Sequence, residues 1–212
     1  MKIAVFGASG TIGQRIAQEA FFRGHEVKAI VRDPARLPLA HPRLTIEVGD
    51  SLDSARVAQT IVGSDVVVSA IGPTGSASVQ VLVDAAHALI ESLPQAGVKR
   101  LVVVGGAGSL EVAPGIQLVD TPNFPEALKA LALAHREALE AYRTAENLDW
   151  TYVSPALFIA PGERTGAYRI ALDQLLTNGK GESRISAEDY AVALVDEIEA
   201  PRFVRQRFTV AY

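Results

Sequence analysis

Cysteine is absent from the 212-residue chain, which excludes disulfides, thiolate metal sites and a cysteine nucleophile. A basic excess is also absent, because 20 lysines and arginines stand against 24 acidic residues and are scattered along the sequence. We therefore expect no nucleic-acid partner, since no basic face is available to neutralise a phosphate backbone. His25, His41 and His87 lie far apart, without an acid or second histidine at ligand spacing, so no metal site is expected.

Long hydrophobic runs are missing too, because no apolar stretch approaches the roughly 18 residues that a membrane span needs. The first predicted strand begins at Lys2, which leaves no room for a signal peptide, and a cytoplasmic protein without a membrane partner is expected. No internal repeat, low-complexity tract or linker divides the sequence. With 49% hydrophobic residues and a net charge of -4, residues 1–212 are expected to form a single globular domain, whose oligomeric state stays open.

The chain does contain short apolar runs that alternate with longer amphipathic segments, a pattern typical of a parallel sheet covered by helices. Most of the runs are near-continuous in valine and isoleucine, as expected of strands buried on both faces. The predicted strands are 2–6, 26–31, 44–47, 65–70, 100–104, 150–153 and 207–210.

Helical spacing of apolar residues predicts crossover helices between these strands, one of them running from Val79 to Leu93. A last helix is predicted over about 187–199, because Ser186 and Asp189 resemble a capping box and Pro201 follows the final turn. Two irregular stretches, around 105–125 and 154–166, follow strands. Loops at the carboxyl ends of parallel strands line the ligand crevice, so both stretches are expected on the substrate side.

The sequence VFGASGTIG, directly after the first predicted strand, places glycines at three-residue spacing. Gly7 permits a sharp turn, Gly10 lets the backbone approach a pyrophosphate, and Gly13 lets the next helix pack close to the strand. The helix would present its N-terminal amides to the anion. A simple tight connection is the alternative. The predicted cofactor-binding residues here are Gly7, Ala8, Ser9, Gly10, Thr11, Ile12 and Gly13.

The second predicted strand ends in the sequence VRDP, which bears on the choice of nucleotide. An acid at this position accepts hydrogen bonds from the adenosine ribose, whereas an arginine suits a 2'-phosphate. Arg32 comes first, with Asp33 behind it and Arg36 a turn further on. The sequence therefore favours NADP(H) over NAD(H) as the cofactor.

Later strands are followed by further candidates for cofactor contact. In the sequence GDSLD, Asp50 is expected to accept from the adenine amine, while Asp53 is expected to cap the next helix. Gly72 lies after the fourth strand, where the backbone passes close to the cofactor. The candidates from these two segments are Asp50, Ser51, Leu52, Ala70, Ile71 and Gly72.

The order GASGTIG, VRDP, GDSLD, AIG, VVVGGAGS and LDWTYVSPALF resembles the atypical short-chain dehydrogenase/reductase superfamily. More narrowly, the chain is similar to small NAD(P)-binding proteins described as NmrA-like or as NADH-flavin reductases, which are related to biliverdin reductase B. The resemblance covers nearly the whole chain. It implies an α/β fold, namely a Rossmann-like doubly wound parallel sheet with helices on both faces. It does not fix the activity, because the group includes reductases, epimerases and cofactor-sensing regulators.

The superfamily typically uses a Tyr-x-x-x-Lys pair, in which the tyrosine delivers a proton to a carbonyl. This chain departs from that pattern, because no tyrosine has a lysine three or four positions later. The usual tyrosine position falls near Ala132 and the lysine near Arg136. Reduction of an unactivated ketone is therefore not expected. Hydride transfer to a flavin or a quinone-like ring stays possible, since the cofactor carries the difficult step.

An apolar slot for a planar acceptor is predicted after the fifth and sixth strands. The residues expected to form its walls are also predicted to contact the cofactor. They are Gly105, Gly106, Pro155, Ala156 and Leu157. Ser109 is the candidate catalytic residue, expected to hydrogen-bond the nicotinamide or an acceptor carbonyl, although a plain loop serine is an equal alternative. Phe158 is the candidate substrate residue, expected to stack on the acceptor unless it belongs to the core.

Three further residues in the sequence have both a functional and a structural interpretation. Glu163 and Arg164 are expected to form a charged pair in the second irregular loop, with a purely structural role favoured. His135 is a candidate proton donor or a histidine whose hydrogen bonds are made locally.

The sequence as a whole predicts an NADP(H)-dependent reductase of a flavin or similar planar acceptor. The alternatives are a non-catalytic NADP(H)-binding redox-sensing regulator and, less favoured, an epimerase or dehydratase.

Overall fold

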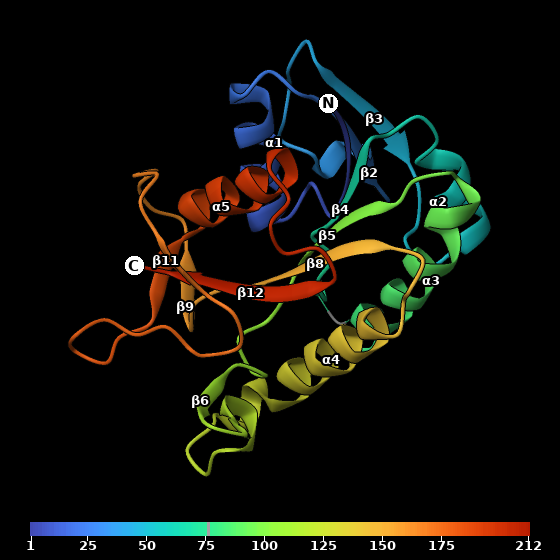
Figure 1. Ribbon diagram of the computed structural model, residues 1–212. Helices are drawn as coiled ribbons and strands as arrows, with labels where there is room; N and C mark the ends of the chain where they lie inside the picture. Colours follow the sequence, from blue (N-terminus) through green and yellow to red (C-terminus); the bar gives the residue numbers. More distant parts are fainter. Residues whose placement is uncertain (76) are drawn as a thin grey trace.

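The computed structural model describes residues 1–75 and 77–212 (Figure 1). Within them, an eight-stranded sheet has the order β10-β12-β8-β5-β4-β1-β2-β3. All neighbouring pairs are parallel except β10 with β12, which is antiparallel. The strands of this sheet are β1 (Lys2–Phe6), β2 (Glu26–Val31), β3 (Leu44–Val48), β4 (Val66–Ser69), β5 (Arg100–Val104), β8 (Asp149–Ser154), β10 (Arg169–Ala171) and β12 (Gln206–Ala211).

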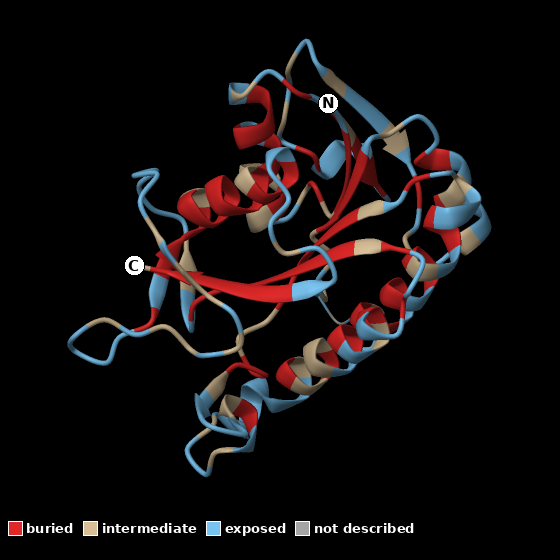
Figure 2. Ribbon diagram, in the orientation of Figure 1, coloured by how far each residue is buried: buried red, intermediate tan, exposed pale blue. Residues whose placement is uncertain are grey.

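Helices cover both faces of the sheet, because β1 and its neighbours bury alternate side chains on each side. One hydrophobic cluster joins Ile3 and Val5 to α1 and α5, and the other joins Ala4 and Phe6 to α2, α3 and α4. The two groups of helices lie on opposite sides of the sheet (Figure 1), and the central strands between them are buried (Figure 2). This is the Rossmann-like doubly wound arrangement, so the predicted fold class is confirmed. The helices are α1 (Thr11–Phe22), α2 (Ser54–Thr60), α3 (Val81–Gln95), α4 (Glu126–Arg143) and α5 (Ala187–Glu199).

The predicted strands match the observed ones to within one or two residues at each end. The capping prediction for the last helix is confirmed, because the Ser186 hydroxyl accepts a hydrogen bond from the Asp189 amide at 2.9 Å. Trp150, expected in the core, is buried on β8. Within the described residues, no helix combines the length and apolarity needed to cross a membrane.

The two irregular stretches contain short elements that the sequence pattern did not reveal. The first holds the hairpin β6 (Glu111–Ala113) and β7 (Ile116–Gln117), followed by the 3-10 helix η2 (Leu118–Asp120). The second holds β9 (Phe158–Ala160), which pairs in parallel with β11 (Arg184–Ser186). A 3-10 helix, η1 (Pro34–Arg36), follows β2.

The sheet order reverses between β1 and β4. The chain passes from β1 to β2 and β3 in one direction, and then returns to place β4 on the other side of β1. In open sheets of this kind, the loops at the carboxyl ends of the strands part at the reversal and leave a crevice. The site is therefore expected above the end of β1.

Candidate functional site

A cleft of about 750 Å³ lies at the carboxyl ends of the parallel strands. We call one part of it the polar end, which is formed by Gly7, Ser9, Gly10, Thr11, Ile12, Arg32, Asp33, Arg36, Gly49, Asp50, Ser51 and Leu52. The other part, the apolar end, is formed by Gly105, Gly106, Leu118, Phe124, Leu128, Leu131, Ala132, His135, Pro155, Ala156 and Leu157. The loop after β4, with Ala70, Ile71 and Gly72, also lines the cleft.

The glycine turn after β1 has a geometry that admits no side chain at two positions. Gly7 has a φ of 76°, and a Cβ on it would lie 2.2 Å from the Ala70 carbonyl oxygen. A Cβ on Gly13 would lie 2.2 Å from the Gly7 carbonyl oxygen. The turn therefore presses α1 against the end of β1 and holds its N-terminus at the cleft.

The N-terminus of α1 is open for an anion. Gly10 is its N-cap residue, and no side chain of the described residues caps the helix. The first turn contains no acidic residue that would repel a phosphate. Backbone amides at such a helix start bind phosphate groups well. The residues present thus fit the pyrophosphate of a dinucleotide.

The loop after β2 directs a cation toward the polar end. Asp33 is engaged locally, because its carboxylate accepts a hydrogen bond from the Ala35 amide at 3.0 Å and caps η1. Arg32 lines the cleft and donates from Nη2 to the hydroxyl of Thr74, in the loop after β4, at 3.2 Å. Arg36, at the end of η1, also lines the cleft.

The loop after β3 supplies the carboxylate of the polar end. Asp50 lines the cleft, and its Oδ1 accepts from the Leu52 amide at 3.1 Å, which fixes the turn. The Asp53 carboxylate accepts from the Arg56 amide at 3.1 Å, so the predicted cap of α2 is confirmed. Of the two acids in this loop, Asp50 therefore lines the cleft and Asp53 caps α2.

A family described as NAD(P)H-binding matches residues 7–201 of the sequence. The chain belongs to this NAD(P)H-binding family. It is 41% identical over 213 residues to the uncharacterized protein YwnB of Bacillus subtilis, with 99% of this chain and 98% of the relative covered. The resemblance inferred from the motifs is confirmed.

Several solved structures with the same fold match the full chain. A Burkholderia pseudomallei protein, provisionally named as exported, is 52% identical with a TM-score of 0.92, and each chain is covered completely. A Streptococcus pneumoniae protein, provisionally named an NADH-flavin reductase, is 38% identical with a TM-score of 0.89. That comparison covers 100% of this chain and 99% of the other.

Four predicted site residues of this NAD(P)H-binding protein do not line the cleft. Ala8 is buried in the core, and Gly13 packs on the Gly7 carbonyl. Phe158 lies on β9 with 63% of its surface exposed, away from the acceptor position expected for it. Each of them is close in sequence to residues that do line the cleft. Successive residues of a strand or turn point in different directions, so a neighbour of a lining residue can face away from the cleft.

Ser109 is the fourth, and its expected catalytic role is corrected by its surroundings. It is 4% exposed, and Arg207 donates from Nη1 to both its hydroxyl and its carbonyl oxygen at 2.9 Å. Arg207 also donates from Nε to Asp173 at 2.8 Å. The serine therefore anchors the loop after β5 to β12 and does not face a ligand.

Gly105 and Gly106 line the apolar end, and the structure gives a packing reason for both glycines. A Cβ on Gly105 would lie 2.1 Å from the Tyr152 ring, and one on Gly106 would lie 2.8 Å from Cγ of His135. A Cβ on Gly72, by contrast, would meet no atom of the described residues within 4 Å. The two glycines after β5 thus make room for side chains beneath the loop.

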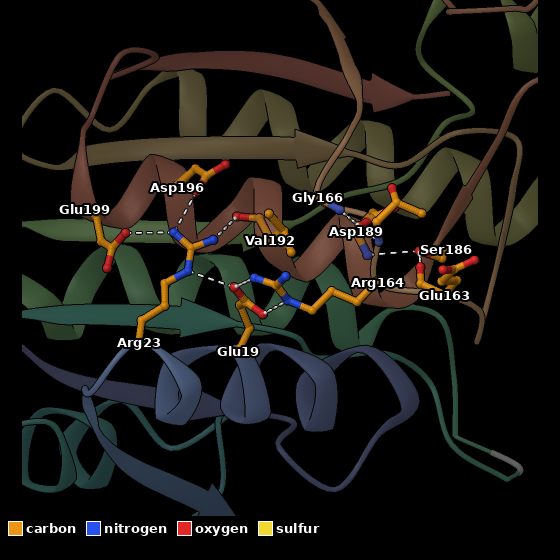
Figure 3. Close-up of polar contacts among 11 residues, drawn as sticks. Glu19, Arg23, Glu163, Arg164, Gly166, Ser186, Asp189, Val192, Asp196 and Glu199 are labelled. Carbon is orange, nitrogen blue, oxygen red and sulfur yellow. Dashed lines mark hydrogen bonds and ion pairs between the residues drawn. The ribbon is translucent and has the colours of Figure 1, made fainter.

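The expected pair between Glu163 and Arg164 is wrong, because Arg164 reaches a partner on α1. Its Nε and Nη2 donate to the two carboxylate oxygens of Glu19 at 2.7 and 2.8 Å. Arg23 also donates to Glu19, at 2.7 Å, and continues to Asp196 and Glu199 on α5 (Figure 3). The loop after β9 is thereby fastened to the two helices on that face.

The same loop is held by Asp189 at the start of α5. The Asp189 carboxylate accepts from the backbone amide of Thr165 at 2.8 Å. It also accepts from the backbone amide of Gly166 at 2.7 Å (Figure 3). Tyr212 donates its hydroxyl to the same carboxylate at 2.8 Å. We use the name α1–α5 brace for the contacts that Glu19, Arg23, Arg164 and Asp189 make between α1, α5 and the loop after β9.

The sequence reasoning predicted Gly105, Gly106, Pro155, Ala156 and Leu157 at the apolar end and considered His135 as a proton donor, but it did not assign four of the lining residues to the site, namely Leu118, Phe124, Leu128 and Leu131. Leu128, Leu131 and His135 occupy one face of α4, at positions three and four residues apart. Leu118 and Phe124 come from the irregular stretch before that helix. The helical spacing was visible in the sequence, but it also suits a helix that faces the core.

The expected tyrosine and lysine positions are occupied by residues that do not supply an acid. Ala132 lines the cleft and packs against the loop after β5, since a Cβ on Gly108 would lie 2.5 Å from its Cβ. Arg136 turns away and donates to Asp120 at 3.0 Å. No tyrosine is found among the described residues that line the cleft.

His135 is the titratable side chain of the apolar end, within the described lining. Burial lowers its pKa to about 4, because the charged imidazolium loses its hydration there. Its Nδ1 lies 3.2 Å from the Tyr152 hydroxyl. The imidazole is therefore neutral at pH 7 and has no spare proton to give as an acid.

Proposed function

We propose that this protein is an NADP(H)-dependent reductase of a flavin or a similar planar acceptor. The main support for the proposal is that the polar end and the apolar end line the same cleft. The polar end offers helix amides and two arginines, and the apolar end offers aliphatic walls and one titratable side chain in its described lining, His135, which is neutral at pH 7. When bound, NADPH supplies a hydride to the acceptor, whose remaining proton comes from water.

The chain's own residues divide the binding between them. The α1 amides face the pyrophosphate, and Arg32 and Arg36 neutralise a 2'-phosphate at the end of β2. Asp50 accepts from the adenine amine. At the apolar end, Leu131 and Leu157 would surround a bound nicotinamide with aliphatic side chains, which would limit side reactions of the hydride with water.

The lack of a side chain that can protonate the acceptor at the apolar end favours some acceptor classes over others. A ketone oxygen needs a proton as the hydride arrives, and neither Ala132 nor neutral His135 supplies one. A flavin or quinone ring delocalises the incoming charge and takes its proton from water. The site is thus suited to acceptors that need orientation more than acid catalysis.

Steady-state oxidation of NADPH in the presence of riboflavin, FMN and a quinone such as menadione tests the proposal. We expect turnover with at least one of these acceptors, and a higher kcat/KM with NADPH than with NADH. Saturable NADPH binding with no turnover on the whole panel would overturn the reductase proposal.

A non-catalytic redox sensor is the second candidate, because the lack of an acid catalyst in the described lining of the apolar end also suits a protein that only binds the cofactor. It predicts no turnover and a large difference between the affinities for NADPH and NADP+. Isothermal titration with both forms of the cofactor separates the two functions, since a reductase needs no such difference.

A further inference from the structure

The apolar end is uncharged as well as apolar. The charged side chains of the described cleft lining are Arg32, Asp33, Arg36 and Asp50, and all of them belong to the polar end. Arg136, the cation nearest in sequence to His135, is turned toward Asp120. A ring that enters this end therefore meets aliphatic side chains, Phe124 and the imidazole of His135.

The tautomer of that imidazole follows from two contacts with Tyr152. The Tyr152 hydroxyl has one proton, and it lies 2.9 Å from the backbone carbonyl oxygen of His135, which can only accept. The hydroxyl oxygen also lies 3.2 Å from Nδ1 of the same residue. Both contacts are hydrogen bonds only if Tyr152 donates to the carbonyl and Nδ1–H donates to Tyr152. The proton of the neutral ring is thus on Nδ1.

Nε2 then carries a lone pair. Within residues 1–75 and 77–212 it has no hydrogen-bond partner, and it is not among the fully enclosed unpaired polar atoms. The packing of the ring against Gly106, where a Cβ would lie 2.8 Å from Cγ, fixes its orientation at the cleft wall. A ligand that buries this nitrogen without giving it a hydrogen bond pays a desolvation cost.

We propose that His135 is a specificity-determining residue, whose Nε2 accepts a hydrogen bond from a ring N–H of the acceptor. The inference rests on the proposed function and narrows it. Flavins carry such a donor at N3, whereas quinones such as menadione carry only acceptor oxygens. The favoured substrate class is therefore an uncharged isoalloxazine, and Tyr152 is the positioning residue that fixes the tautomer.

Equilibrium binding to the protein saturated with NADP+ tests this without turnover. The probes are lumiflavin and its N3-methyl analogue, which differ in the single donor, and quenching of flavin fluorescence reports the affinity. We expect lumiflavin to bind about tenfold more tightly, as one hydrogen bond predicts. His135→Phe should make the two affinities equal, and His135→Gln, which keeps an acceptor oxygen, should restore part of the preference.

A spectroscopic measurement on the wild-type protein tests the inference even if a His135 variant fails to fold. Two-bond hydrogen–nitrogen NMR correlations of the wild-type histidine rings report which nitrogen is protonated. We expect Nδ1–H for His135 at pH 7, and a shift toward the other tautomer in Tyr152→Phe. A wild-type Nε2–H signal, equal affinity for the two flavins, or no binding of either overturns the inference.

The outcomes separate this inference from the proposed function. NADPH oxidation with menadione or riboflavin, together with indifference to N3 methylation, retains the reductase and rejects the role of His135. A His135-dependent preference for lumiflavin without NADPH oxidation by any acceptor does the reverse, and identifies a flavin-binding site that is not catalytic.

Discussion

The polar end of the cleft is built around the backbone of one glycine turn, whereas the apolar end is built from side chains of several distant segments. The glycine turn brings amides of one continuous segment to the start of α1, and the nearby Asp33 and Asp50 hold their own loops. At the apolar end, Leu118, Leu131 and Leu157 come from three separate parts of the chain. The first surface is set by local geometry and the second by tertiary packing.

The difference predicts how each end responds to change. A backbone surface fails when the turn is distorted, because its shape has few alternatives. A surface of side chains tolerates substitution, but its chemistry changes with each one, so acceptor preference can alter while the fold is kept. Substitutions at each end therefore test whether the two surfaces differ in this way.

The largest effect is expected from Gly7→Ala at the polar end. The new Cβ would lie 2.2 Å from the Ala70 carbonyl oxygen in a residue with a φ of 76°. We expect a loss of about 3 kcal/mol in the free energy of unfolding and loss of NADPH binding, measured by urea unfolding and fluorescence titration. Gly72→Ala is the matched control, because its Cβ would meet no described atom within 4 Å. Equal stability of the two variants would contradict the assigned geometry.

The next effect concerns the α1–α5 brace, which supports α1 and the loop after β9. Burial raises the pKa of the Asp189 carboxyl, but hydrogen bonds from Thr165, Gly166 and Tyr212 outweigh it and leave the pKa below its usual range. Asp189→Asn should cost about 2 kcal/mol, because the amide group cannot accept all these bonds.

The pH dependence of that variant follows from the direction of the shift. A carboxyl whose pKa is lowered in the folded state stabilises the fold above its unfolded pKa of about 3.9, and this stability is lost as the pH falls through the folded pKa. The difference in unfolding free energy between wild type and Asp189→Asn should be constant from about pH 8 to pH 5 and shrink below about pH 4. A difference that already shrinks between pH 8 and pH 6 would assign the effect to another group.

The sequence was most informative where partners are neighbours. The glycine turn, the Asp53 cap and the Ser186 cap each depend on residues a few positions apart, so their geometry can be read from spacing. The errors involve distant partners. Ser109 is bound by Arg207, and Arg164 is bound by Glu19, 145 positions away. Neither contact has a local signal, because the fold alone brings the two segments together.

The apolar end shows the same limit in another form. Leu128, Leu131 and His135 have the spacing of one helix face, and that spacing does not say whether the face meets the sheet or a cleft. Their role depends on how α4 lies beside the loop after β5, where Gly106 and Gly108 let the helix approach. Those contacts involve residues more than twenty positions apart and form only in the folded protein.

A smaller effect is expected from Arg32→Ala, which tests the nucleotide preference of the polar end. Removal of the guanidinium should weaken NADPH binding by about tenfold or more, because a charged hydrogen bond to the 2'-phosphate is lost. NADH binding should change by less than about threefold, since its ribose hydroxyl does not need the cation. Titration with both cofactors at one salt concentration measures the ratio, and equal losses would show that Arg32 does not contact the phosphate.

The smallest effect is expected from placing a charge at the apolar end. Leu128 lines the cleft and is 52% exposed, so Leu128→Lys can extend its ammonium group into solvent at the rim without burying it. FMN differs from riboflavin by a phosphate, and attraction across the rim should raise the FMN to riboflavin ratio of kcat/KM by about fivefold at low salt. Leu128→Gln is the control for lost apolar surface. The gain should disappear at high salt, and a gain that persists there, or that also occurs in the glutamine variant, would mean that the apolar end is not the uncharged acceptor surface inferred from its lining.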